Sequence, residues 1–513
     1  MKAFIKDIYA GMPDAKDEVF SDNSEKFFES FIVPPELPVN KLMTGEKFLV
    51  SGYKGVGKTS VLYYLQDRAQ AENSNTCCSF IYFKSDYEEL RKSQMDMIAK
   101  KLTSLVDISG EIQPNKVEYL HIWRWVFFKQ IVDDSTHNIN NLFEEDDNWN
   151  LFVKKVNSIC FNSKDKHVIS LSSLAISTSL STKEGAKVSA NADFEIKKSI
   201  ANFQRFTNTV DECEALFGLL RRTNIPYYIF VDEIEAFYGD KDLFTRDLTL
   251  IRDLLFTIHR LNMTKQVRII AAIRSEIINA MDRFITTREI NKIVDGYTVP
   301  IKWSYSNTNS LNHPIIQVLM KRIAMACPGQ MCEFKDWFPD EIYGKDTVSY
   351  ILDNGWNKPR DIVRFITAAQ NDSLHCNDVF FSKAAIETLM KEYSRNSLAE
   401  IRQELQSLYS STEIELALRL LRGGPRIVDK ESIRKRAAKG SPARQFWDER
   451  GDDVVEDFYR VGIFGNINRY SYAPEWKWRW NHKDDTGVLT DNHWELVVHH
   501  AICKELSIPY NID

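Results

Sequence analysis

A phosphate-binding loop is the strongest chemical signal in this 513-residue sequence. Residues 52–59 read Gly-Tyr-Lys-Gly-Val-Gly-Lys-Thr and match the pattern G-x-x-x-x-G-K-[ST] completely. The glycines allow the backbone to turn its N–H groups around phosphate oxygens, and the helix that follows directs its positive end at them. Lys58 can reach the β- and γ-phosphates of a nucleotide, and the Thr59 hydroxyl can bind Mg²⁺. A glycine-rich turn without a ligand is the alternative, but the apolar strand at 48–50 and the helical spacing after the loop favour the functional interpretation.

A second motif places two carboxylates at the end of a strand. Residues 227–231 are five large apolar residues in a row, which is typical of a strand buried on both faces of a parallel sheet. Asp232 and Glu233 follow directly, and such a position is costly unless it faces a charged ligand. We predict that Asp232 holds Mg²⁺ and that Glu233 is the general base for the attacking water. An ordinary loop start is the alternative, but the complete phosphate-binding loop upstream favours the Mg²⁺-binding interpretation.

Three arginines follow at positions that could meet a γ-phosphate. Residues 267–273 form another apolar strand that ends at Arg274, and ligands of parallel sheets bind at the carboxyl ends of strands. Arg274 is therefore a candidate sensor or stabiliser of the γ-phosphate, with a surface arginine on a turn as the alternative. Arg283 and Arg288 lie before a closing strand at 297–301, and either could be an arginine finger for a neighbouring subunit or a solvated helix charge.

The order of these motifs resembles the AAA+/STAND group of P-loop NTPases. More narrowly, the chain resembles a poorly characterised bacterial P-loop ATPase family in residues 9–18 and 31–35, 47–50, 301–304, 321–323 and 357–361. The resemblance implies a setting among bacterial anti-phage defence genes. It also matches Arg360, which follows Pro359 at a helix start, to the sensor-2 position of the lid. An ion pair of Arg360 with Asp361 or Asp353 is the alternative.

The sequence predicts an α/β protein made of several parts. We expect a lead-in at 1–45, a P-loop NTPase core with a parallel sheet at 46–305, a helical lid at 306–395 and a winged-helix-like C-terminal module at 396–513. The long separation of the loop from Asp232 requires an insertion at about 100–205. There we predict helices from the aromatic-rich residues 117–132, and a β-hairpin from the alternation at 169–173 and 188–192. This hairpin could meet a partner or be ordinary surface.

One basic cluster stands out in a chain whose net charge is −6. The segment from Arg422 to Arg444 contains eight basic residues and only two acidic residues, Asp429 and Glu431. The cluster could contact nucleic acid or an acidic protein surface, and ordinary solvated charge is the alternative. Residues 476–480 alternate tryptophan with basic residues, which fits either stacking on a nucleic-acid strand or a strand whose tryptophans face the core.

Composition excludes several classes of protein. Apolar residues make up 43% and charged residues 27%, so the chain is neither disordered nor collagen-like. It has no run of 18 apolar residues and no signal-like start, so we expect a cytoplasmic protein with no membrane partner. The eight cysteines are scattered, so reduced thiols are a simpler interpretation than a zinc site at Cys327 and Cys332.

We therefore predict a Mg²⁺-dependent ATP hydrolase that acts as a switch or motor. A nucleic-acid-binding module that uses ATP to hold a conformation or oligomer is the alternative, and the presence of Glu233 favours hydrolysis. The expected cofactors are ATP and Mg²⁺, and the expected partners are further copies of the chain, an effector protein and nucleic acid. The assigned residues are Glu233, Lys58 and Arg274 for catalysis, Thr59 and Asp232 for Mg²⁺, and Gly52, Tyr53, Lys54, Gly55, Val56, Gly57, Lys58, Thr59, Ser60 and Arg360 for the nucleotide.

Overall fold

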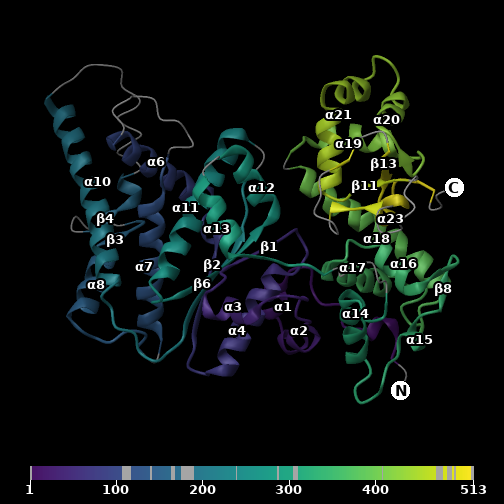
Figure 1. The fold of residues 1–513 in the computed structure, drawn as a ribbon, viewed down its shortest axis with the longest axis horizontal. Helices are drawn as coiled ribbons and strands as arrows, with labels where there is room; N and C mark the ends of the chain where they lie inside the picture. The colour runs from purple at the N-terminus through teal and green to yellow at the C-terminus, as the bar shows by residue number, and fades with distance from the viewer. Residues whose placement is uncertain are drawn as a thin grey trace. The chain divides into compact units, whose positions relative to one another are not determined.

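The computed structural model divides the chain into two compact units, which are described separately (Figure 1). The sheet unit comprises residues 37–53 and 58–300, and the helical unit comprises residues 1–36, 54–57 and 301–513. The structure describes residues 3–509 apart from 107–116, 139–140, 163–167, 175–189, 238–239, 286–287, 304–309, 407, 469–477, 482–487 and 490–492.

The sheet unit is built on five parallel strands in the order β2-β5-β6-β1-β7. Their bounds are β1 Leu49–Gly52, β2 Cys77–Tyr82, β5 Tyr227–Ile234, β6 Arg268–Arg274 and β7 Thr298–Pro300. The strands β1, β5, β6 and β7 lie where the sequence predicted strands. The central strands are apolar because helices cover both faces of the sheet. The predicted α/β class with a parallel sheet is therefore confirmed.

Both faces of this sheet are packed. On one face Ile229 and Val231 belong to a large buried core that also contains Leu254 of α11 (Lys241–Met263) and Phe127 of α7 (Leu120–His137). On the other face Tyr63, in α4 (Lys58–Glu72), stacks on Phe80 at 4.7 Å, and Phe80 stacks on Phe230 at 5.0 Å. The strands are thus held rigidly, which fixes the loops at their carboxyl ends.

The insertion of the sheet unit is helical where it is described. Helix α7 packs against α11, and α8 and α10 pack against α7 (Figure 1). The remaining elements of the unit are α3 Val39–Thr44, α5 Phe83–Asp86, α6 Glu89–Val106, α8 Asp147–Asn157, β3 Ile159–Cys160, β4 Ile169–Ser170, α10 Ala190–Phe217, α12 Ser275–Phe284 and α13 Arg288–Tyr297. Large aromatic side chains of residues 117–132 are buried in α7, as the sequence predicted.

The predicted β-hairpin in the insertion is wrong. Strand β4 pairs in parallel with β3, and residues 171–174 after it are helical. Ala190 and Ala192, expected in the second strand, begin helix α10. Val188 and the expected turn at 183–185 lie outside the described residues. Alanine favours a helix strongly, so a short alternation that relies on alanine is weak evidence for a strand.

The helical unit contains the chain ends and the predicted lid. Its elements are η1 Ile5–Asp7, α1 Ala15–Val19, α2 Ser24–Ser30, α14 Pro314–Met325, α15 Phe334–Trp337, β8 Glu341–Ile342, β9 Lys345–Asp346, α16 Thr347–Asp353, α17 Pro359–Gln370, α18 Lys383–Leu405, α19 Ser411–Leu421, β10 Ile427–Val428, α20 Lys430–Arg436, α21 Pro442–Arg460, β11 Phe464–Ile467, β12 Trp478–Arg479, β13 Glu495–Val498 and α23 His500–Cys503. Helix α18 runs through the predicted boundary at residue 395, which is therefore misplaced. In the described part of the chain, no helix has the length and apolar character needed to cross a membrane.

An antiparallel sheet organises the C-terminal part of this unit. Its four strands have the order β10-β13-β11-β12, and α19, α20 and α21 precede or interrupt them along the chain. The winged-helix-like description stays a prediction.

Candidate functional site

The phosphate-binding loop has the backbone that its glycines allow. It leaves β1 at Gly52, and Gly55 and Gly57 adopt φ values of +83° and +89°, which side chains with a Cβ rarely tolerate. Helix α4 begins at Lys58, as predicted. The Lys58 ammonium donates to the carbonyl oxygens of Gly52 and Tyr53 at 2.9 and 3.0 Å, so it folds back over the mouth of the loop. Ser60 continues the first turn of α4.

Thr59 and Asp232 meet beside this loop. The hydroxyl of Thr59 lies near the carboxylate of Asp232, which is only 4% exposed. Burial raises the pKa of Asp232, while the Thr59 hydroxyl and the charge of Lys58 oppose the rise. Asp232 Oδ2 has no hydrogen-bond partner among the described residues. An unpartnered buried carboxylate oxygen next to a hydroxyl suits Mg²⁺, which takes few protein ligands and completes its shell with water and substrate phosphates.

Glu233 is held in a special conformation. Its φ is +55°, and the pairing of β5 with β6 shifts register between Val231 and Ile234. Glu233 Oε2 accepts a hydrogen bond from Ser85 N at 3.0 Å and another from Ser85 Oγ. Such strain in a non-glycine residue persists only where its surroundings enforce it, and it turns Glu233 away from the alternation of the strand. Ser85 could not be predicted as a partner of Glu233, because the sequence alone does not show that β2 lies beside β5.

Arg274 is paired with a carboxylate that was not among the predicted site residues. It lies at the end of β6 and forms an ion pair with Glu235, which also lies 3.5 Å from Lys84 Nζ. Gly52 and Arg274 are register partners in neighbouring strands, and Tyr82 and Asp232 are partners on the other side. The sheet order therefore gathers the loop, Asp232 and Arg274 at one edge, as expected for a ligand site of a parallel sheet.

Arg283 and Arg288 are placed only by their backbones. Arg283 lies in α12 and Arg288 begins α13. Their side chains are outside the described part of the structure, so the arginine-finger assignment stays a prediction.

Within the helical unit, Arg360 contacts the phosphate-binding loop. A Cβ on Gly55 would lie 3.1 Å from the Arg360 Cβ, so glycine allows the two segments to pack closely. Arg360 forms an ion pair with Glu400 of α18 at 2.7 Å and donates to Pro13 O at 3.0 Å. The expected alternative pairing with Asp361 or Asp353 is not the one observed. Trp303 Nε1 donates to Val56 O at 2.8 Å and so fixes the middle of the loop.

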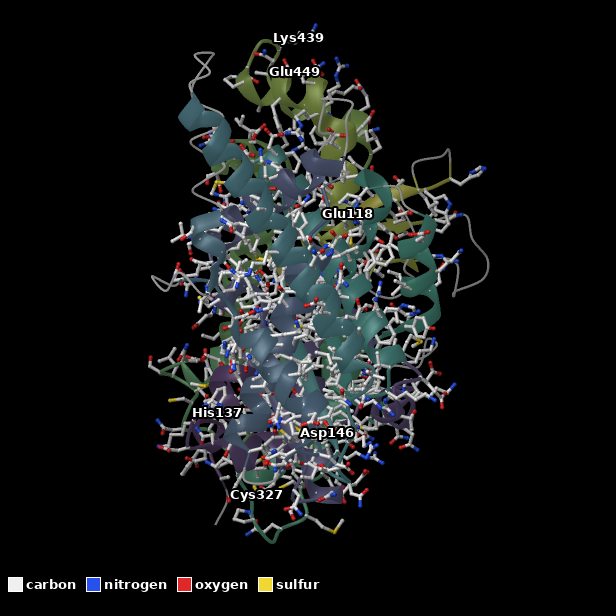
Figure 2. All side chains as sticks on the ribbon, turned by 90° about the vertical axis from the view of Figure 1, so that its left-hand side faces the viewer. Glu118, His137, Asp146, Cys327, Lys439 and Glu449 are labelled. Atoms are coloured by element: carbon white, nitrogen blue, oxygen red, sulfur yellow. The ribbon has the colours of Figure 1, made fainter. Side chains whose placement is uncertain are left out.

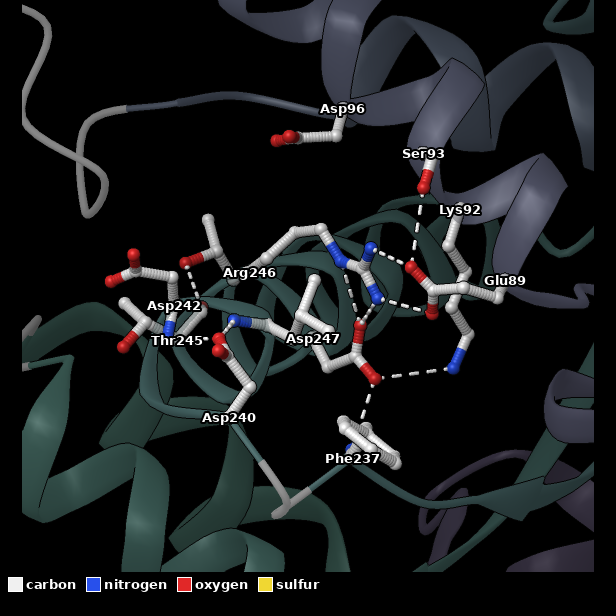
Figure 3. A network of polar contacts seen from close by, with 12 residues as sticks. Glu89, Lys92, Ser93, Asp96, Phe237, Asp240, Asp242, Thr245, Arg246 and Asp247 are labelled. Carbon is white, nitrogen blue, oxygen red and sulfur yellow. Dashed lines mark hydrogen bonds and ion pairs between the residues drawn. The ribbon is translucent and has the colours of Figure 1, made fainter.

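A buried charge network connects α6, α11 and the backbone of Phe237, which follows β5 (Figure 3). Asp247 of α11 is fully buried and lies 2.7 Å from Arg246 Nη2 and 3.2 Å from Lys92 Nζ. Its Oδ2 also accepts from Phe237 N, just after β5, at 3.0 Å. Arg246 in turn makes two bonds to Glu89 of α6, at 2.5 and 2.9 Å. The network joins α6 and α11 to the segment that follows Glu233.

The basic cluster between Arg422 and Arg444 is partly paired with acidic residues of its own module. Asp448 of α21 pairs with Arg434 at 2.6 Å and with Arg444 at 3.1 Å, and Lys430 pairs with Asp452. Arg426 is 4% exposed and donates to Val498 O at 3.0 Å. The acidic partners on α21 lie just beyond the segment from Arg422 to Arg444. Their pairing reduces the excess positive charge, and contact with nucleic acid stays a prediction.

The alternating tryptophan segment is described only from residue 478 onward, because Trp476 and Lys477 lie outside the described residues. Trp480 is buried against Ile467 and Val497, so this tryptophan faces the core. A Cβ on Gly465 would lie 2.4 Å from its ring. Trp480 is therefore a packing residue.

One member of the cluster serves a structural role that can be tested. Arg436 donates to Leu420 O at 2.6 Å and to Arg422 O at 2.7 Å, at the end of α19. We expect Arg436→Ala to lower the free energy of unfolding by about 1 kcal/mol, because the helix end loses a charged partner. Lys439→Ala is the control: Lys439 is exposed at the outer edge of the module (Figure 2), and its loss should change little. Urea unfolding of both variants measures the difference, and equal midpoints would contradict this role.

Comparison with known proteins adds two similarities. The family described as FunZ-associated C-terminal helical domain matches residues 313–402, nearly the segment predicted as the lid. Among solved structures, the Orc1 protein of Aeropyrum pernix in complex with DNA matches over 95% of this chain and 95% of its own, with 11% identity and a TM-score of 0.38. No curated protein matches the sequence. At this level of similarity, the DNA partner of that structure is not transferred to this chain.

Proposed function

We propose that the chain binds ATP and hydrolyses it with Mg²⁺. The observation that carries the proposal is the buried carboxylate of Asp232 near Thr59 and the glycine-rich loop, with Asp232 Oδ2 unpartnered among the described residues. Thr59 and Asp232 would hold Mg²⁺, which neutralises charge on the phosphate oxygens. No group of three or more His, Cys, Asp and Glu residues suited to a metal occurs among the described residues, and water and nucleotide phosphates would complete the shell of Mg²⁺.

The remaining roles are assigned to Lys58, Glu233 and Arg274 of the sheet unit and, separately, to Arg360 of the helical unit, which packs against Gly55 of the loop. Lys58 would leave the loop carbonyls and bind the phosphates, which are stronger partners for an ammonium. Glu233, fixed through one oxygen by Ser85, would accept the proton of the attacking water. Arg274 would respond to the γ-phosphate by exchanging Glu235 for it. Arg360 would report the nucleotide to the helices of the lid.

The broader role is a nucleotide-controlled switch or motor. Self-association through Arg283 or Arg288, an effector protein and a setting in anti-phage defence stay predictions from the sequence and its family resemblance. A nucleic-acid-binding role at the basic cluster also stays a prediction, and acidic residues of α21 pair with part of that cluster.

Nucleotide titration tests the proposal directly. With a fluorescent ATP analogue and Mg²⁺, we expect Lys58→Ala to weaken binding at least about tenfold, because the phosphates lose a charge-assisted partner. Asp232→Asn should abolish the gain in affinity that Mg²⁺ gives, because the neutral amide is a poorer ligand for a hard cation. Lys41→Ala, at an exposed lysine of α3, is the matched control and should bind like the wild type. Absence of saturable binding in the wild type would refute the assignment.

A further inference from the structure

Glu400 of α18 draws three cationic side chains together. Its Oε1 lies 2.7 Å from Arg360 Nη1 and 3.9 Å from Lys54 Nζ, and its Oε2 accepts from Arg364 Nη2. Lys54 belongs to the phosphate-binding loop, and Arg360 packs against Gly55 of the same loop. Although burial opposes it, the charges of Arg364 and Arg360 lower the pKa of Glu400 to about 2. The carboxylate is therefore charged at neutral pH.

The cations around Glu400 differ in their exposure and in their other partners. Arg364 is 11% exposed and has two further side-chain partners, Ser397 Oγ at 3.1 Å and Asp361 Oδ1 at 3.6 Å. Arg360 is 25% exposed, and its second partner is a backbone oxygen. Carboxylate and phosphate oxygens are interchangeable partners for a guanidinium or an ammonium. Arg360 and Lys54 can therefore exchange Glu400 for a phosphate, while Arg364 stays in place.

We propose that Glu400 pairs with Arg360 and Lys54 in the nucleotide-free chain, and that nucleotide phosphates replace Glu400 as the partner of both cations on binding. The inference rests on the proposed nucleotide site. Arg364 makes the exchange feasible, because a half-buried carboxylate left without any cation would be strongly unfavourable. Glu400 thus competes with the nucleotide, lowers its affinity and restores the resting pairing of Arg360 when the nucleotide leaves. It is a positioning residue for Arg360 and has no role in the chemical step.

The test is a titration of the full-length chain with a fluorescent ATP analogue and Mg²⁺. Glu400→Gln should bind about tenfold more tightly than the wild type, because a neutral amide competes weakly for Arg360 and Lys54. Glu392→Gln is the matched control on the same helix: its partner is the neutral amide of Asn371, at 2.8 Å, and affinity should not change. In an Arg360→Gln background, the gain from Glu400→Gln should largely disappear, since one of the contested cations is gone.

Each outcome separates this inference from the proposed function. Unchanged or weaker binding by a folded Glu400→Gln variant overturns the inference and leaves ATP binding intact. If the wild type shows no saturable binding of the ATP analogue, the proposed function itself is refuted. If Glu400→Gln unfolds below the working temperature, Glu400→Asp keeps a charge near Arg364 and withdraws it from Arg360. That variant should tighten binding several-fold, and failure to do so also overturns the inference.

Discussion

Replacing Glu233 by glutamine is expected to stop ATP turnover while leaving nucleotide binding intact. The amide has nearly the shape of the carboxylate, and its oxygen can still accept the hydrogen bonds of Ser85 N and Oγ. It cannot accept a proton from water at neutral pH, so the general base is lost although its position is kept. Loss of such a base lowers turnover by about 10²–10⁴-fold. Phosphate release at saturating ATP measures the change.

Two comparisons make this result specific. Glu72→Gln removes an exposed carboxylate from α4 that pairs with Arg68, and turnover should equal that of the wild type. Affinity for the fluorescent ATP analogue should be unchanged within about threefold in Glu233→Gln, since binding depends on the loop and Mg²⁺. Equal turnover in wild type and Glu233→Gln would remove Glu233 from the mechanism and favour a site that holds ATP without hydrolysing it.

The strands of the sheet unit were predictable because their burial is visible in the sequence. A strand covered on both faces must be apolar throughout, so residues 227–231 and 269–273 stand out from their surroundings. Their neighbours in the sheet were not predictable, since register depends on packing between segments far apart in the chain. Ser85 illustrates the difference: it reaches Glu233 only because Tyr82 and Asp232 are register partners.

Ion pairing was the least predictable part of the candidate site. The sequence suggested local partners for Arg360, but the observed partner, Glu400, lies on another helix. Arg274 likewise meets Glu235, which follows a different strand. In the basic cluster, counting charges within one segment missed the acidic face of α21 that packs against it. Charge patterns reveal which residues need partners, and tertiary packing decides which partners they get.

The buried network around Asp247 is expected to be essential for the stability of the sheet unit. Asp247 faces Arg246 and Lys92, whose side chains are 6% and 10% exposed, and it also binds Phe237 N. Asp247→Ala leaves these cations short of a counter-charge and the Phe237 N–H without its acceptor. Breaking a buried pair in this way costs about 3–5 kcal/mol. For a unit of this size, the unfolding temperature should fall by about 10 °C, which calorimetry of the full chain measures.

The nature of the replacement distinguishes charge from hydrogen bonding at this position. Asp247→Asn can still accept from Phe237 N but cannot neutralise Arg246 and Lys92, so it should lose more than half of the stability lost by Asp247→Ala. Asp242→Ala, at an exposed aspartate one turn away in α11, is the control and should shift the transition by no more than about 2 °C. Full recovery in Asp247→Asn would show that the acceptor alone matters.

The network also links stability to the candidate site, because it acts on both segments that hold Glu233. Glu89 and Lys92 lie in the first turn of α6, shortly after Ser85, which follows β2. Phe237 follows β5, the strand that contains Glu233. Loss of the Asp247 contacts would therefore make both the segment with Ser85 and the segment with Glu233 more mobile. The φ of +55° at Glu233 is a strained conformation, which only fixed surroundings maintain. We expect Asp247→Asn, assayed well below its unfolding temperature, to keep ATP binding and to lose turnover. A variant with reduced thermal stability and wild-type turnover would show instead that Ser85 alone holds Glu233 in place.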